Sequence, residues 1–205
     1  MKALIIVDIQ NDFLPGGSLA VMQGDKTIDI INKLQPHFDL VVATQDWHPA
    51  DHKSFAANHP GKNPGDVIRL NGLDQVLWPV HCVRDTEGAR INEALDTALI
   101  RKIIYKGTDP SIDSYSGFYD NGYKKSTGLG EYLKSMEVET VYVVGLATDY
   151  CVKFTALDSH RMGFQTYVIF DATRAVNLQP DDHDNALAEL EKAGVKVIKS
   201  KFILG

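Results

Sequence analysis

Residues 140–162 read TVYVVGLATDYCVKFTALDSHRM, and the change of pattern within them indicates the architecture. The first part, residues 140–146, is an almost continuous apolar run, which is typical of a strand covered on both faces. The part from Cys151 onward predicts a helix, and Gly163 after it suits the left-handed cap that ends many helices. A further apolar run at 166–170 predicts a second strand. The segment therefore has the strand, helix, strand order of a parallel crossover unit.

The same alternation extends along the chain. Apolar, β-branched runs recur at intervals, and helical patterns separate most of them. The runs are residues 3–9, 40–44, 102–105, 140–146, 166–170 and 195–198. Strands and helices in alternation predict an α/β protein with three layers, α/β/α, around a mostly parallel central sheet. In such sheets ligands bind beyond the carboxyl ends of the strands.

Composition limits the classes of function. The 205 residues are 44% apolar and 23% charged, so we expect a single globular domain over residues 1–205. The net charge of −6 and the lack of a basic run argue against a nucleic-acid partner. No segment approaches the roughly 20 apolar residues that cross a bilayer, so no membrane partner is expected. The two cysteines, Cys82 and Cys151, are expected to be free thiols in a reducing cytoplasm. A small-molecule substrate is the expected partner, and a homo-oligomer is left open.

Three polar residues stand where predicted strands end: Asp8, Lys106 and Cys151. Because the carboxyl ends of parallel strands share one edge, we expect an acid, a base and a thiol to meet there for covalent catalysis. At the start of a helix and beside an ammonium group, the pKa of Cys151 is expected to be lowered. Asp8 then accepts the thiol proton and passes it to the leaving amine. Each residue alone also has a structural explanation, as packing, a cap or a turn, so only their combination favours catalysis.

A second polar cluster is predicted around a long loop. Residues 48–80 are rich in Pro, Gly, Asn and His and too long for an ordinary connection, so we expect a metal-binding loop region over about 46–81. Asp46 and His48 stand two apart at the end of a strand, so their side chains share one face. His81 is the candidate third ligand, and two imidazoles with one carboxylate suit zinc, iron or manganese. His52 is a weaker candidate, and an Asp-x-His pair alone is a weak signal.

Six motifs follow one another across nearly the whole chain: VDIQNDF, TQDWHPADHKSF, WPVHC, YKGTD, SGF and GLATDYCV. In this order they closely resemble the nicotinamidases of the isochorismatase-like cysteine hydrolase superfamily. VDIQNDF and GLATDYC indicate the superfamily, whereas DWH followed by WPVHC resembles the metal signature of the nicotinamidase branch. The resemblance implies the fold expected above and the hydrolysis of nicotinamide to nicotinate and ammonia for NAD salvage. It also implies that pyrazinamide is commonly accepted.

The resemblance implies roles for individual residues as well. It gives the catalytic triad as Asp8, Lys106 and Cys151. It gives the metal ligands as Asp46, His48 and His81. The residues that match the family's ring-binding aromatics are Phe13, Trp78 and Tyr115. Zinc is the favoured metal, with iron or manganese as alternatives, and His52 or water is expected to complete its shell.

The turn after residues 140–146 is expected to form an oxyanion hole from the backbone N–H groups of Ala147 and Cys151. Successive N–H groups of a regular strand point to opposite sides, so the two donors converge only where the backbone departs from standard geometry. The resemblance implies a cis peptide bond between Leu146 and Ala147 at this place.

Three alternatives are open at the level of sequence. The nearest is a related hydrolase of another small amide, a ureide or the enol ether of isochorismate, which need not carry the DWH and WPVHC cluster. Non-haem iron oxygenases also use two His and one acid, but their usual scaffold is a β-barrel and Cys151 would have no role. A thiol redox or binding protein on a flavodoxin-like sheet lacks its Cys-x-x-Cys pair here.

Overall fold

Six parallel strands form the central sheet of the protein, which the computed structural model describes over all of residues 1–205. The strands are β1 Lys2–Val7, β2 Leu40–Asp46, β5 Ile100–Lys106, β6 Thr140–Leu146, β7 Gln165–Arg174 and β8 Lys196–Ile198. Their order across the sheet is β5-β2-β1-β6-β7-β8, and every neighbouring pair is parallel. Each strand lies where an apolar run predicted one, so the expected three-layer α/β fold is confirmed.

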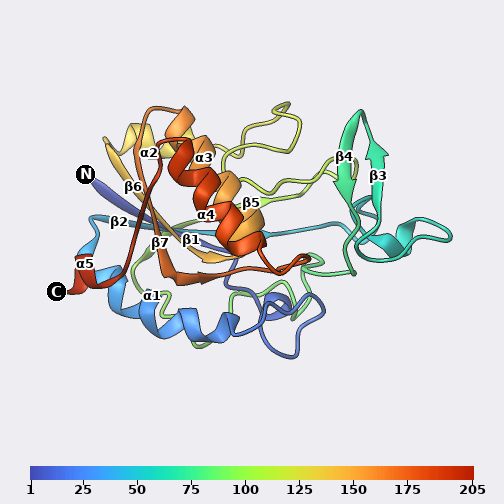
Figure 1. The fold of residues 1–205 in the computed structure, drawn as a ribbon, viewed down its shortest axis with the longest axis horizontal. Coiled ribbons are helices and arrows are strands. Elements are labelled where there is room, and N and C mark those ends of the chain that lie inside the picture. The colour runs from blue at the N-terminus through green and yellow to red at the C-terminus, as the bar shows by residue number, and fades with distance from the viewer.

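Helices cover both faces of this sheet. They are α1 Ile28–Leu34, α2 Leu129–Ser135, α3 Lys153–Arg161, α4 Asp182–Lys192 and the short α5 Lys201–Leu204. Figure 1 shows α2, α3 and α4 together on one face and α1 on the opposite face. None of these helices combines the length and the apolar character that crossing a membrane requires.

The position of β1 explains its continuous apolar run. Leu4 and Ile6 lie in the core on the side of α1, whereas Ile5 and Val7 lie in the core beneath α2, α3 and α4. All four side chains are fully buried. Because successive residues of a strand point to opposite faces, a strand with helices on both sides is apolar at every position.

The sheet has a switch point between β1 and β6. From β1 the sheet extends through β2 to the edge strand β5, and from β6 it extends the other way through β7 to β8. Such a switch point leaves a crevice at the carboxyl ends of the strands, and ligands of α/β proteins bind there. Asp8 directly follows β1 and Ala147 directly follows β6, so both residues lie at this crevice.

The long loop contains a hairpin that the sequence analysis did not predict. β3 Val67–Leu70 and β4 Leu73–Val76 pair in the antiparallel sense. Figure 1 shows this hairpin at the end of the molecule opposite the two termini. The hairpin therefore lies beyond the carboxyl ends of the strands, on the side where the crevice opens.

Shorter 3-10 turns occupy Asn11–Phe13, Gly24–Thr27, Gln35–His37 and Ala56–Asn58.

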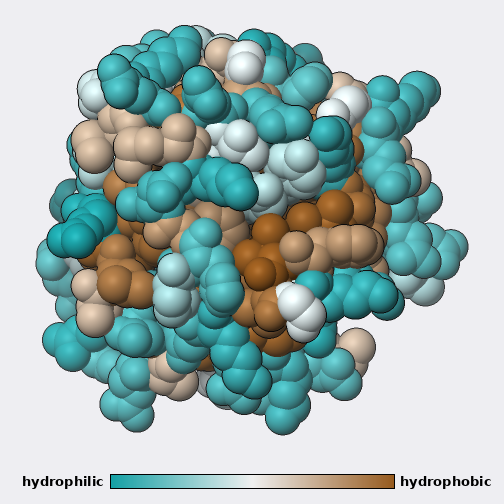
Figure 2. Space-filling model, turned by 90° about the vertical axis from the view of Figure 1, so that its left-hand side faces the viewer, coloured by the Kyte–Doolittle hydropathy of each residue, from teal (hydrophilic) through white to brown (hydrophobic).

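The surface at the other end of the molecule differs in character. Figure 2 views the side where both termini lie, at the amino ends of the strands, and hydrophilic side chains cover most of it around a smaller apolar area. The polar residues that end or directly follow the strands are instead buried at the opposite end, among them Asp8, Asp46 and Lys106. The chemistry of the protein is therefore concentrated at the carboxyl edge of the sheet.

Candidate active site

The ammonium group of Lys106 lies at the centre of a buried polar group. Lys106 ends β5, and its Nζ lies 2.8 Å from Asp8 Oδ2, 2.5 Å from Asp46 Oδ1 and 3.3 Å from Cys151 Sγ. Burial alone would lower the pKa of Lys106, but Asp46 and Asp8 outweigh it and hold that pKa well above its usual range. The group is therefore a permanent cation that holds two carboxylates and the thiol together.

Asp8 faces both the ammonium group and the thiol. Thr44 Oγ1 donates a 2.6 Å hydrogen bond to Asp8 Oδ1, whereas Oδ2 makes no well-directed hydrogen bond despite the nearby Lys106 Nζ. A carboxylate oxygen of Asp8 lies within 4.8 Å of Cys151 Sγ. Burial raises the pKa of Asp8 more than Lys106 lowers it. Oδ2 is thus ion-paired with Lys106, and the raised pKa of Asp8 suits a group that takes up the thiol proton.

The structure corrects the expected setting of Cys151. A π-helical turn over Thr148–Val152 contains this residue, and α3 begins only at Lys153. The side chain is buried, and burial raises the pKa of the Cys151 thiol well above its usual value, although Lys106 opposes the shift. The expectation of a lowered pKa is therefore wrong for this structure, because the loss of hydration outweighs the ammonium group. Cys151 rests as a thiol and needs a base in order to react.

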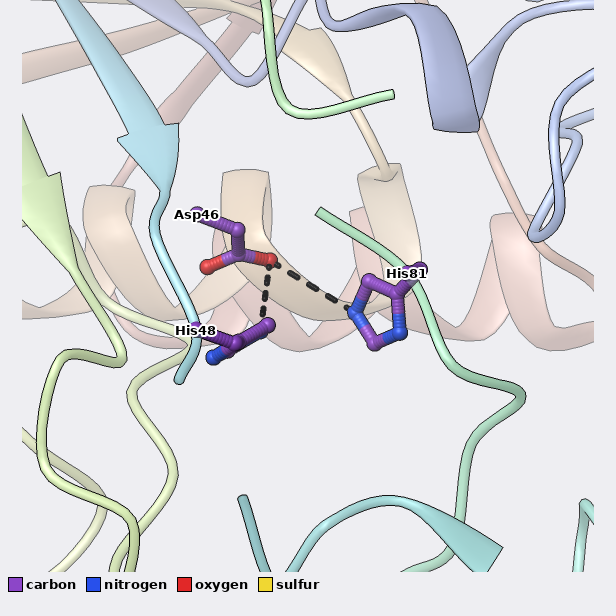
Figure 3. Close-up of side chains that lie close together, drawn as sticks. All are labelled: Asp46, His48 and His81. Atoms are coloured by element: carbon purple, nitrogen blue, oxygen red, sulfur yellow. Dashed lines mark ion pairs between the residues drawn. The ribbon is translucent and has the colours of Figure 1, made fainter. Parts of the chain in front are cut away.

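Asp46, His48 and His81 converge from two segments that are distant in sequence (Figure 3). Asp46 ends β2, and its Oδ2 lies 3.6 Å from His48 Nε2 and 3.9 Å from His81 Nε2. Ligands of a tetrahedral zinc ion lie about 2.0–2.2 Å from the metal and therefore roughly 3.3–3.6 Å from one another. The three ligand atoms are thus close to the separation that one small cation imposes.

The second nitrogen of each imidazole supports a metal site. His48 Nδ1 donates a 2.8 Å hydrogen bond to Gly107 O, and His81 Nδ1 donates one of the same length to Pro79 O. With Nδ1–H engaged in this way, the Nε2 lone pairs face Asp46, as in metal-bound histidines. Burial and the neighbouring His48 lower the pKa of His81 to about 4, which keeps its imidazole neutral. Burial also acts to lower the pKa of His48, but Asp46 outweighs it and raises that pKa. The residues present therefore fit a divalent metal ion.

His52 is buried beside this cluster and not in solvent. Its ring centroid lies 4.3 Å from that of His48, and its Nδ1 lies 2.7 Å from Ser54 Oγ. Its Nε2 is buried without a hydrogen-bond partner. His52 also groups with His48 and Asp113, with one ligand atom of each within 4.8 Å of the others. A metal ion or an ordered water at this position would satisfy the free nitrogen.

An aromatic pocket joins the thiol to the metal cluster. It is open to solvent, and Asp46, His81 and Cys151 all contribute to its lining. The three aromatics singled out by the resemblance also line it, namely Phe13, Trp78 and Tyr115. The residues that the sequence analysis did not indicate are Leu19, Asp113, Tyr150 and Val176. A flat aromatic ring that carries a small polar group matches such a lining.

Ala147 lines the same pocket, and the peptide bond between Leu146 and Ala147 is cis, as the resemblance implied. Ala147 is followed at once by the turn that carries Cys151. Both residues of the expected oxyanion hole therefore border the space in which a substrate carbonyl would lie.

Two residues that hold the site together were missed from the sequence. Gln10 Oε1 accepts a hydrogen bond from Asp46 N, and its Nε2 donates one to Asp46 O, both at 2.8 Å. Gln75 of β4 donates to Asp113 Oδ2 at 3.1 Å. Gln10 stands in the motif VDIQNDF, which is a signal that could have identified it. Nothing in the local sequence indicates Gln75, because its partner is 38 residues away.

Comparison with known proteins shows similarity along nearly the whole chain. The Isochorismatase domain family matches residues 2–202. The chain is 48% identical over 202 residues to a nicotinamidase of Acinetobacter baylyi, with 98% of this chain and 94% of that protein covered. It is 47% identical over 197 residues to a nicotinamidase of Escherichia coli, with 94% and 92% covered.

Solved structures resemble this one in fold as well. A nicotinamidase/pyrazinamidase of Acinetobacter baumanii superposes with a TM-score of 0.96 at 47% identity, covering 99% of this chain and 98% of that one. A pyrazinamidase of Pyrococcus horikoshii in complex with zinc gives a TM-score of 0.79 at 38% identity, covering 97% and 98%. Sequence and fold therefore agree over almost the full length of the chain.

Proposed function

The chain belongs to the isochorismatase family, and from that premise we propose that it is an amidohydrolase that converts nicotinamide to nicotinate and ammonia. The main support for the proposal is one observation. Cys151 Sγ, Lys106 Nζ and the Asp8 carboxylate lie close together at one aromatic pocket. The similarity to nicotinamidases of two bacteria over more than nine-tenths of this chain supports the choice of substrate.

The first half of the reaction forms a thioester. Phe13, Trp78 and Tyr115 hold the flat ring and direct its carboxamide toward Cys151. Asp8 Oδ2 takes the thiol proton while Sγ bonds to the carboxamide carbon, and the carbonyl electron pair moves onto oxygen. The backbone N–H groups of Ala147 and Cys151 donate to that oxyanion. The C–N bond then breaks, and the nitrogen leaves as ammonia with the proton from Asp8.

The second half returns the enzyme to its starting state. Asp8 removes a proton from a water molecule that adds to the thioester carbon, and the C–S bond breaks to release nicotinate. The sulfur regains its proton from Asp8. Throughout, the Lys106 ammonium, 3.3 Å from Sγ, compensates the negative charge that passes between sulfur and carboxylate. This role explains why a lysine is buried here at the centre of two acidic side chains.

Asp46, His48 and His81 would hold a divalent metal, which we propose to be zinc, with iron and manganese as alternatives. When bound, such an ion supplies a Lewis acid for the ring nitrogen of the substrate or for a water molecule. The zinc in the pyrazinamidase of Pyrococcus horikoshii and the donor set of two imidazoles and one carboxylate support this choice. His52 or water would complete the shell.

We also propose that pyrazinamide is a substrate and that the reaction serves NAD salvage in the cytoplasm. A relative with 47% identity is a nicotinamidase/pyrazinamidase by name, and the two rings differ by one nitrogen. The two cysteines, Cys82 and Cys151, are free and buried, which suits a reducing compartment.

The decisive experiment measures ammonia and nicotinate released from nicotinamide by purified protein of known metal content. We expect equal amounts of both products, with pyrazinamide hydrolysed in parallel. Hydrolysis of a ureide or another small amide without hydrolysis of nicotinamide would show that the substrate is wrong. Failure to hydrolyse any amide in the metal-loaded state would show that the mechanism is wrong.

A further inference from the structure

Asp149 is a buried acid that the mechanism above does not use. In sequence it lies between Ala147, a proposed oxyanion donor, and the nucleophile Cys151. Its side chain lies in the turn over Thr148–Val152 and is only 6% exposed as a residue. No Lys, Arg or His side chain lies within ion-pair distance of it. A buried carboxylate without a cation is costly unless hydrogen bonds offset its lost hydration. Its partners therefore indicate what it does.

Those partners are two successive backbone N–H groups of one loop. Asp149 Oδ1 accepts a 3.0 Å hydrogen bond from Val176 N, and Oδ2 accepts a 2.9 Å bond from Asn177 N. This loop follows β7, and its residues are exposed from Asn177 through Pro180. Both oxygens of one carboxylate thus bind the point where the loop leaves the body of the protein.

The loop residue held in this way also contacts the substrate space. Val176 is half-buried and lines the aromatic pocket together with Leu19, Ala147 and Cys151. Val176 and Leu19 are the larger aliphatic side chains of this lining beside the small Ala147, whereas the aromatic ones are Phe13, Trp78, Tyr115 and Tyr150. The position of Val176 therefore limits the space available to a bound ring.

A second connection joins the same two segments. Thr148 Oγ1 donates to Thr173 Oγ1 at 2.9 Å, one residue before Asp149 and three before Val176. His183 of α4, beyond the loop, donates a 3.0 Å hydrogen bond from its backbone N–H to Asn177 Oδ1. The carboxylate of Asp149 is the charged member of this series and the one bound directly to the residue in the pocket wall.

We propose that Val176 is a specificity-determining residue, which excludes ring-substituted amides, and that Asp149 is the positioning residue that fixes Val176 against the nucleophile turn. The proposal rests on the function proposed above, since it concerns the substrates of that site. With the two charge-assisted hydrogen bonds to Asp149, the backbone at Val176 keeps its position and a larger ring does not fit. Without these bonds, Val176 can move away and admit the larger ring.

The test compares nicotinamide with 5-methylnicotinamide and 6-methylnicotinamide in the same ammonia assay. One methylene in an apolar pocket is worth about 10- to 200-fold in kcat/KM. In Val176→Ala we expect the preference for nicotinamide over at least one methylated amide to fall by about tenfold or more. Leu178→Ala is the matched control, because Leu178 is an exposed aliphatic residue of the same loop outside the pocket lining. Equal preferences in Val176→Ala and wild type would overturn the proposal.

Asp149→Asn tests the positioning role, because the amide nitrogen must face one of the two N–H donors. We expect the preference to fall as in Val176→Ala, with a rise in KM for nicotinamide larger than the drop in kcat. The double variant should show no further loss of preference, since Asp149 acts through Val176. A merely structural role would lower thermal stability and kcat for all three amides alike, and that result would overturn the positioning role.

Amide hydrogen exchange of the wild-type protein decides the matter if Asp149→Asn does not fold. The N–H groups of Val176 and Asn177 should exchange slowly in spite of their place at the root of an exposed loop. Exchange as fast as that of the N–H group of Leu178, the exposed next residue of the loop, would overturn the proposal. This measurement needs no substrate, so it tests the positioning role of Asp149 independently. Whether nicotinamide is the substrate is tested separately by the ammonia assay of the wild-type protein.

Discussion

The backbone carbonyl of Gly107 accepts a 2.8 Å hydrogen bond from His48 Nδ1, and a Cβ at residue 107 would overlap the His48 ring. Gly107 also has a φ of +61°, in the left-handed region. The residue after Lys106 thus sets the orientation of the His48 imidazole, so the proposed triad and the proposed metal site are coupled through the backbone at the end of β5.

Gly107→Ala should lower metal affinity by about 10- to 100-fold, because the orientation of a ligand histidine depends on the group that binds its second nitrogen. Metal content after dialysis against a series of free zinc concentrations measures the effect. Gly61→Ala is the control, since Gly61 also has a positive φ, of +76°, but a Cβ there meets nothing within 4 Å. Equal metal affinity in the two variants would contradict the coupling.

Cys151→Ala should abolish turnover, with a loss in kcat of at least about 10⁴-fold, while the fold and the metal content stay intact. The other thiol provides the comparison, because Cys82 lies in the apolar core beneath α1. Cys82→Ala should retain activity at a modest cost in stability. Substantial turnover by Cys151→Ala, free of wild-type contamination, would rule out the thioester route.

His48→Ala and His81→Ala should lose metal and activity together, since each removes one of three protein ligands. A chelator should reproduce the loss in the wild-type protein, and added zinc should restore activity there but not in the variants. Metal analysis and ammonia release on the same samples check this. Full activity of the stripped wild-type protein would show that the ion has no part in hydrolysis.

Asp46→Ala should destabilise the metal-free protein more than His81→Ala does. Asp46 is a proposed metal ligand and also the nearer of the two carboxylates paired with the buried Lys106 ammonium. Removing one partner of a buried charge costs about 3–5 kcal/mol. Urea unfolding at pH 7 with chelator present measures the difference. Equal unfolding free energies would mean that Asp8 alone is enough for Lys106.

Thr44→Val should shift the acid limb of the pH profile to higher pH. Burial already raises the pKa of Asp8, and Lys106 and the hydroxyl of Thr44 act in the opposite direction. Because catalysis uses the ionised form, kcat/KM falls as pH drops through this pKa, and loss of the hydroxyl raises the pKa further. Thr27→Val is the control, since Thr27 is equally buried but binds only Gly24 O. An unchanged acid limb in Thr44→Val would remove Asp8 as the group that sets it.

The strands were predictable because burial on both faces leaves a trace in local sequence. The hairpin was missed for the opposite reason, since β3 and β4 are short and mostly exposed or half-buried. Asn71 and Gly72 between them, with φ values of 52° and 85°, are the turn residues that would have indicated it. The hydrophobic pattern of the local sequence therefore predicted the buried strands but not the hairpin at the surface.

The convergence of the candidate site residues was predictable to the extent that these residues end strands. Asp8, Asp46 and Lys106 follow or close an apolar run, and a parallel sheet brings such positions to one edge. The supporting contacts were not predictable in this way, because Gln10 and Asp46, for example, are 36 residues apart. The prediction of a lowered pKa for Cys151 was wrong for the same reason, since the depth of burial of a side chain is a property of the whole fold.

The central place of β1 has a consequence for how the chain is made. β1 pairs on one side with β2 and on the other with β6, where Lys2 lies opposite Thr140. At ribosomal rates of about 5–20 residues per second, β1 waits on the order of ten seconds for that second partner to be synthesised. During this interval one edge of an apolar strand is open to other chains, and Cys151 has not yet been synthesised. Recovery of activity during refolding should accordingly follow the closure of this one long-range pairing, which makes enzyme assay a direct probe of the slow, high-contact-order step.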